Sequence, residues 1–243
     1  MLGIFRKSKS VNNPIKVDIH SHLLPGLDDG VSSFEESLEI ILKFEEAGYQ
    51  KLVTTPHIMS DFYKNTPDII NGKLQELKSF IESQTSMIVE AAAEYYLDES
   101  FMDLLSEGND NILKIDGKYV LFETAFISEP LHLKEAIFKI QSIGLKPILA
   151  HPERYRYFLN DWKLVCDIYD RGTCFQLNIN SIQGYYSKSV QKLAMKLIRN
   201  EMVNFVGSDC HNIAHFEVML DTLKTKRYQE AVRLRLINNS LLK

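Results

Sequence analysis

Residues 17–30 read VDIHSHLLPGLDDG and combine two histidines, three aspartates and two glycines just after an apolar run. The apolar run 15–19 predicts a short β-strand that ends at His20 and His22. Side chains alternate along an extended segment, so these two imidazoles can reach one ion. The proline and glycines that follow predict a turn carrying Asp28 and Asp29. The stretch therefore predicts metal ligands at a strand end, and a polar turn that merely contains histidine is the ordinary alternative.

The composition describes a protein able to bury a sizeable core, since 45% of its 243 residues are apolar. Its 28 basic and 32 acidic residues argue against a nucleic-acid partner, which would need a wide basic face. Three cysteines without a CxxC pair indicate reduced thiols. We find no apolar segment typical of a signal peptide and no run near the roughly 18 apolar residues of a transmembrane segment. We therefore expect a cytoplasmic protein in which residues 1–14 form a flexible N-terminal segment.

Short apolar or β-branched runs alternate with segments of helical spacing along the whole chain. The predicted strands are 15–19, 51–55, 86–93, 119–122, 147–149, 174–177 and 203–206. The predicted helices are 32–48, 67–82, 131–143, 162–171, 188–200 and 227–238, and Asp116-Gly117 predicts a tight hairpin turn. Helix 32–48 has a Ser-x-x-Glu capping box and ends at a glycine. This alternation favours a single α/β domain over residues 1–243 with a parallel sheet, either closed as a barrel or open and doubly wound.

Polar residues gather where these strands end, which is where parallel α/β folds place their chemistry. They are His20, His22, Asp28, Asp29, His57, Glu94, Glu123, His151, Asn178, Asn180, Asp209 and His211. Any one of them alone has an ordinary structural explanation, but together they indicate a metal site. Imidazole with carboxylate suits manganese, iron, zinc or nickel, and bridging carboxylates suit several ions. We interpret His132 and His215 as residues of helical stretches and Cys210 as a packing residue.

Several divalent ions held this way would favour hydrolysis, most naturally of a phosphate ester. Arg154, three residues after His151, can grip a phosphate through two N–H groups. A cysteine nucleophile needs an arginine at a spacing that no cysteine of this chain has; the nearest pair, Cys166 and Arg171, is one residue short.

The motifs DIHSHLLPGLDDG, TTPH, AAAEYYLD, LFET, AHPERY and GSDCHN, in this order over residues 18–212, resemble the PHP (polymerase and histidinol phosphatase) superfamily. They resemble most closely its bacterial CpsB/CapC-type protein-tyrosine phosphatases, which accompany capsule and exopolysaccharide loci. The resemblance implies a distorted, TIM-like (β/α)7 barrel with three divalent ions, most commonly Mn²⁺, with iron or zinc as alternatives.

The resemblance also implies a role for each candidate ligand. The first ion would be held by His20, His22, Glu94 and Asp209, the second by Glu94, Glu123 and His151, and the third by Asp29, His57 and His211. A metal-bound hydroxide would attack phosphotyrosine, and the expected substrate is a bacterial tyrosine autokinase. The family has a second arginine near the place of Phe216, so phosphate binding here rests on Arg154, with His215 as a possible substitute.

Three other functions remain open from the sequence. A small-molecule phosphatase of the histidinol-phosphate kind would share the metal site. A metal-dependent nuclease is disfavoured by the net charge. A non-catalytic, metal-stabilised binding partner of a kinase would explain the absent second arginine.

Overall fold

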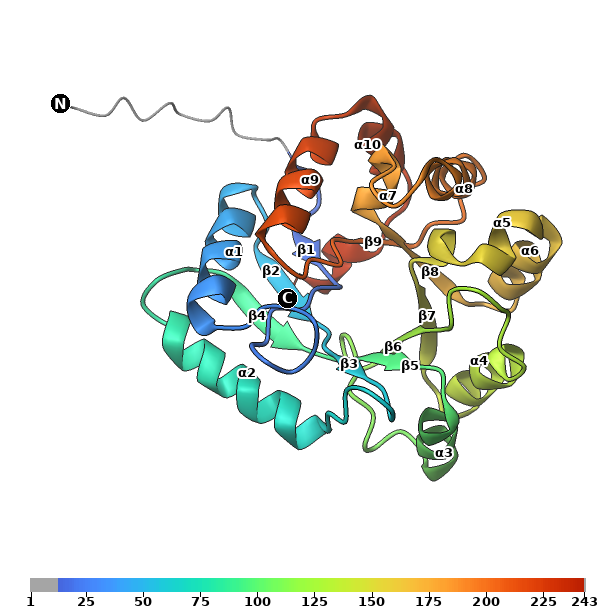
Figure 1. Ribbon diagram of the computed structural model, residues 1–243, viewed down its shortest axis with the longest axis horizontal. Coiled ribbons are helices and arrows are strands. Elements are labelled where there is room, and N and C mark those ends of the chain that lie inside the picture. The colour runs from blue at the N-terminus through green and yellow to red at the C-terminus, as the bar shows by residue number, and fades with distance from the viewer. Residues whose placement is uncertain (1–12, 243) are drawn as a thin grey trace.

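The computed structural model describes residues 13–242 and shows parallel strands at the centre with helices around them (Figure 1). The strands are β1 Val17–Asp18, β2 Lys51–Thr54, β3 His57–Ile58, β4 Ile88–Ala91, β5 Glu94–Tyr96, β6 Tyr119–Glu123, β7 Lys146–Ala150, β8 Cys174–Asn178 and β9 Phe205–Gly207. They form two sheets, in the orders β1-β2-β4 and β3-β5-β6-β7-β8-β9, and every neighbouring pair is parallel. The predicted α/β class with parallel sheets is confirmed.

The chain passes twice from the first sheet to the second, because β2 is followed by β3 and β4 is followed by β5. The predicted strand 86–93 contains only β4, and β5 begins one residue beyond it in the other sheet. Pro56 lies at the break and has no N–H to donate to the neighbouring strand, although Glu94 N still donates to its carbonyl over 3.2 Å. An isolated parallel bridge joins Ser21 to Cys210, beyond the ends of β1 and β9. The pairing thus differs from the single closed sheet that the resemblance implies.

The helices are α1 Phe34–Glu46, α2 Pro67–Ile81, α3 Glu99–Glu107, α4 Leu133–Ser142, α5 Arg156–Asn160, α6 Trp162–Asp170, α7 Ile179–Gln183, α8 Lys188–Arg199, α9 Ile213–Leu223 and α10 Lys226–Ala231, with 3₁₀ turns η1 Pro152–Arg154 and η2 Asn238–Leu241. The capping prediction for α1 is confirmed: Ser33 accepts from Glu36 N at 3.2 Å, and Gly48 follows the helix at φ 89°. The hairpin turn is confirmed too, since Asp116 and Gly117 both have positive φ between bridged neighbours.

The predicted helix 227–238 is wrong beyond Ala231, where α10 ends. Asn238 is instead buried, and its amide donates to the carbonyls of Val17 (3.0 Å) and Val206 (2.8 Å). Its Oδ1 accepts from Val206 N at 3.0 Å. The segment is not helical here because Asn238 bonds to both β1 and β9. The spacing of apolar residues within the segment cannot predict these long-range bonds.

Residues 1–12 of the predicted flexible segment lie outside the described residues. Asn13, the first described residue, is buried, and its Oδ1 accepts from Tyr228 Oη at 2.8 Å. Among residues 13–242, we find no helix of the length and apolar character that crossing a membrane requires.

Candidate metal centre

Strand pairing brings the candidate ligands to one place at the carboxyl ends of the strands. In the parallel register His57 of β3 lies beside Glu94 of β5, and Tyr96 of β5 lies beside Glu123 of β6. Near the ends of β1 and β9, Asp209 N donates to the carbonyl of His20 at 2.8 Å. All nine residues predicted as ligands lie in one continuous network of imidazole–carboxylate contacts of 3.0–3.8 Å.

The deepest part of the cluster contains His20, His22, Glu94 and Asp209. The Nε2 atoms of His20 and His22 lie 3.0 and 3.4 Å from Glu94 Oε2, and each is 3.4 Å from Asp209 Oδ1. The side chains of both histidines and of Glu94 are fully buried. One ligand atom from each of His20, His22 and Glu94 falls within 4.8 Å of the others, and Asp209 contacts both histidines.

The second part joins Glu94 to Glu123 and His151. His151 Nε2 lies 3.1 Å from Glu94 Oε1 and 3.8 Å from Glu123 Oε2. The structure adds His57 here, because its Nδ1 lies 3.3 Å from Glu94 Oε2 and 3.2 Å from Glu123 Oε1. This buried Nδ1 has no hydrogen-bond partner, which fits a ligand atom facing an ion.

The third part lies at the mouth of the site. Asp29 Oδ1 is 3.5 Å from both His57 Nε2 and His211 Nε2, and the Asp29 side chain is 56% exposed. His22 can join this group, since one ligand atom from each of the four residues falls within 4.8 Å of the others. His22 and His57 therefore stand between neighbouring groups, a sharing that the sequence does not reveal.

Hydrogen bonds to Nδ1 orient three of the histidines. His20 Nδ1 lies 2.8 Å from Gln176 Oε1, His22 Nδ1 lies 2.7 Å from Asp28 Oδ2, and His211 Nδ1 lies 2.9 Å from the carbonyl of Asp209. An N–H donated through Nδ1 leaves Nε2 as the free ligand atom. Asp28 thus holds a ligand while its neighbour Asp29 faces the mouth.

Sequence reasoning missed Gln176, whose only signal is a polar side chain in the otherwise apolar interior of β8. Gly207 makes room for it: a Cβ at this position would lie 2.6 Å from Gln176 Nε2 and 2.9 Å from His20 Cβ. Gly30 has a similar role, because a Cβ there would collide with the carbonyl oxygen of His22. Both positions need glycine, because a side chain there would collide with Gln176 and His20 in one case and with His22 in the other.

Electrostatics keep Glu94 and Asp209 ionised. Burial alone would lower the pKa of His20, but Glu94 and Asp209 outweigh it and raise that pKa to about 9. Burial would raise the pKa values of Glu94 and Asp209, yet the neighbouring imidazoles hold both well below their usual range. Protons therefore occupy positions that a divalent cation would take.

Arg154 stands at the edge of the cluster. Its NH1 lies 2.7 Å from Asp209 Oδ2, and its guanidinium lies between the rings of Phe126 (4.8 Å) and Tyr186 (4.3 Å). Asn178 Nδ2 supports this arrangement by donating to Asp209 Oδ2 at 2.8 Å and to Tyr186 Oη at 3.0 Å. The aromatic faces restrict the plane of the guanidinium, and the Arg154 side chain is 22% exposed.

The remaining predicted positions are also resolved. His215 on α9 lies beside the cluster, with Nδ1 3.3 Å from the carbonyl of Asp209. Phe216, near the place where the resemblance implies a second arginine, is buried against Phe44. Cys210 is buried as expected, and burial raises the pKa of its thiol, which disfavours a thiolate nucleophile.

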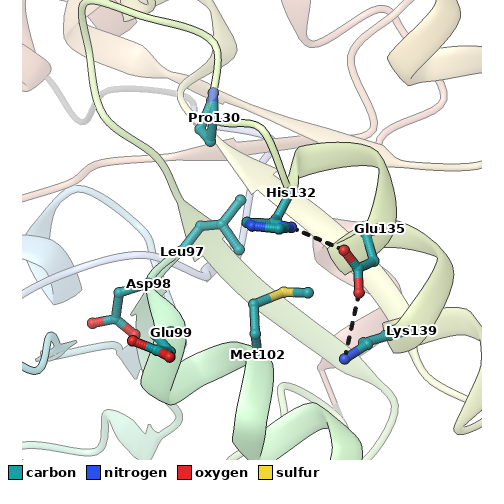
Figure 2. Close-up of a pocket in the computed structure, with 8 residues that line it drawn as sticks. All are labelled: Leu97, Asp98, Glu99, Met102, Pro130, His132, Glu135 and Lys139. Atoms are coloured by element: carbon teal, nitrogen blue, oxygen red, sulfur yellow. Dashed lines mark hydrogen bonds and ion pairs between the residues drawn. The ribbon is translucent and has the colours of Figure 1, made fainter.

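A separate pocket of about 520 Å³ lies between α3 and α4 (Figure 2). Glu135 there lies 2.9 Å from His132 Nδ1 and 3.6 Å from Lys139 Nζ. His132 precedes α4 and its side chain is 64% exposed. None of the eight residues lining this pocket is a predicted metal ligand. His132 is therefore not part of the metal-ligand cluster.

Comparison with known proteins identifies the family. Residues 16–239 match the family described as capsular polysaccharide synthesis, CpsB/CapC. The chain belongs to the CpsB/CapC family. This confirms the resemblance seen in the motifs.

Relatives within the family carry phosphatase names. The chain is 29% identical over 236 residues to the putative tyrosine-protein phosphatase CapC of Staphylococcus aureus, covering 93% of this chain and 90% of the relative. It is 28% identical over 200 residues to the tyrosine-protein phosphatase YwqE of Bacillus subtilis (strain 168), and the match covers 81% of this chain and 78% of the relative.

A solved structure shares the fold of this family member. It comes from work on YwqE of Bacillus subtilis and CpsB of Streptococcus pneumoniae, described there as unique metal-dependent tyrosine phosphatases. The TM-score is 0.77 at 24% identity, covering 90% of this chain and 94% of that chain. At this identity the likeness shows the fold, and function is argued from the site.

Proposed function

We propose that this protein is a metal-dependent protein-tyrosine phosphatase. The observation that carries the proposal is the continuous imidazole–carboxylate cluster with an aromatic-stacked arginine, Arg154, at its edge. The phosphatase names of the CapC and YwqE relatives support it. We further propose the distorted seven-stranded barrel of the PHP superfamily, with the bridge between Ser21 and Cys210 as the contact between its first and last strands.

The donor set fits divalent cations, since it contains nitrogen and oxygen ligands and no thiolate. We assign His20, His22, Glu94 and Asp209 to one ion, Glu94, Glu123 and His151 to a second, and Asp29, His57 and His211 to a third, with Mn²⁺ as the expected metal. Bound ions would supply an activated water at neutral pH and neutralise charge on the phosphate.

The chain's own groups would bind and orient the substrate. Arg154 would donate N–H bonds to phosphate oxygens, because Phe126 and Tyr186 hold its plane and Asp209 anchors one end of its fork. Asp209 would link this grip to the metal ligands through its second oxygen. His215 would assist as a weaker partner, and the 3.3 Å distance from its Nδ1 to the carbonyl of Asp209 supports this.

We propose a phosphotyrosine protein as the substrate, specifically a bacterial tyrosine autokinase that controls capsule or exopolysaccharide synthesis, and a cytoplasmic location. The description of the family as capsular polysaccharide synthesis supports this choice.

Purified protein with added manganese is expected to release phosphate from a phosphotyrosine peptide. His20→Ala should abolish turnover, and so should a chelator. His132→Ala is the matched control, because this histidine is exposed and outside the cluster. Turnover that survives both treatments would contradict the proposal, and so would a strong preference for histidinol phosphate over the peptide.

A further inference from the structure

The segment between β6 and α4 places an aromatic side chain beside the proposed phosphate site. Phe126 lies three residues after Glu123, and its ring stacks on that of His151 with centroids 5.6 Å apart and planes 18° apart. The Arg154 guanidinium lies 4.8 Å from the same ring. Phe126 therefore contacts both His151, a proposed metal ligand, and Arg154, the proposed phosphate-binding residue.

Backbone hydrogen bonds hold the segment that carries Phe126, and neighbouring side chains pack against its ring. Arg156 N donates to the Phe126 carbonyl at 2.8 Å, and Thr124 N donates to Tyr155 Oη at 3.2 Å at the start of the segment. Tyr155 also packs 5.6 Å from the Phe126 ring. Despite these contacts Phe126 remains 38% exposed. An apolar ring that packs against neighbouring side chains and is partly open to solvent at a polar site is suited to contact a ligand.

We propose that Phe126 is the specificity-determining residue that recognises the aromatic ring of the substrate. This inference rests on the proposed phosphatase function. A phosphate held between Arg154 and the cluster carries its ester group outward past Phe126, where a phenyl ring can stack and an alkyl group cannot. The residue thereby favours aryl over alkyl phosphate esters.

A second aromatic residue is the competing candidate. Tyr63 stacks on His57, with centroids 5.5 Å apart and planes 15° apart, at the part of the cluster that includes Asp29. We favour Phe126 because it touches Arg154, to which a phosphate would bind, and Tyr63 does not share that contact among the described residues.

The test measures binding, so that it does not depend on turnover. Calorimetry of the manganese-loaded protein with phenylphosphonate and methylphosphonate gives the preference for an aryl group. Phe126→Leu is expected to weaken phenylphosphonate binding about 2- to 12-fold more than methylphosphonate binding, the range for one aromatic stacking contact, because any loss through Arg154 affects both ligands equally. Phe138→Leu is the matched control, since this phenylalanine on α4 is 69% exposed.

Three results would overturn the inference. Equal weakening of both phosphonates would mean that Phe126 only positions Arg154. No change in either would remove its role, and a selective loss in Tyr63→Leu instead would assign recognition to the other ring. If the wild type binds phenylphosphonate selectively but hydrolyses no phosphotyrosine peptide, the proposed function fails while ring recognition stands.

Discussion

Asp28 offers the sharpest test of how the cluster is held, because it contacts a ligand without facing the mouth. Its Oδ2 accepts from His22 Nδ1 at 2.7 Å and from His57 N at 3.0 Å, and its Oδ1 accepts from Gly30 N at 3.0 Å. The side chain is fully buried. Asp28→Asn replaces a group that accepts at both ends with one that accepts at one end and donates at the other.

The magnitude follows from this mismatch. All three partners are N–H donors, so the new amide NH₂ must face at least one of them in a buried place. A hydrogen bond to a charged group contributes about 1.5–3 kcal/mol. Since about 1.4 kcal/mol is a tenfold change in affinity, we expect metal binding at His22 to weaken roughly 10- to 100-fold. That range matches the usual loss when the partner of a ligating histidine is removed.

The assay is calorimetric titration of metal-free protein with Mn²⁺, alongside thermal unfolding to show that the variant folds. Asp61→Asn is the matched control, because Asp61 is exposed in the segment after β3 and the same charge is removed. Wild-type affinity in a folded Asp28→Asn protein would falsify the view that Asp28 orients His22.

Three further predictions concern the same site. Arg154→Lys should raise the KM for an aryl phosphate about tenfold or more at unchanged metal content, because lysine lacks the planar fork that stacks between two rings; an unaltered KM would refute the assignment. Gly30→Ala should destabilise the protein by about 1–3 kcal/mol in thermal unfolding, since its Cβ would meet His22, whereas Gly72→Ala, with open space around it, should not. Metal affinity should rise with pH toward about 9, because the raised pKa of His20 means that a proton must leave before an ion binds; calorimetry at pH 6.5, 7.5 and 8.5 that shows a flat affinity would exclude this.

The sequence predicted the arrangement of βα units well because each strand and helix carries its own local pattern. The N-cap at Ser33 and the turn at Asp116-Gly117 depend only on neighbouring residues, and both appear as expected, although the Glu36 side chain accepts from Ser32 N and not from Ser33 N. Helix 227–238 failed because the buried amide of Asn238 bonds to two distant strands. The five-residue helices α5 and α7 were missed because they offer little periodicity to detect, and the nine-residue helix α3 was missed although Asp98 caps its first turn.

The sequence alone determined which chemical groups this protein can bring to its site, since histidines and carboxylates recur at the ends of its strands. Only the tertiary structure decided how they are shared. His57 contributes a nitrogen to each of two neighbouring groups, Asp28 holds His22 while Asp29 faces the mouth, and Gln176 orients His20 across the fold. The physical reason is that alternation along a strand sets the direction of a side chain, whereas its partner depends on which strands pair and in what register.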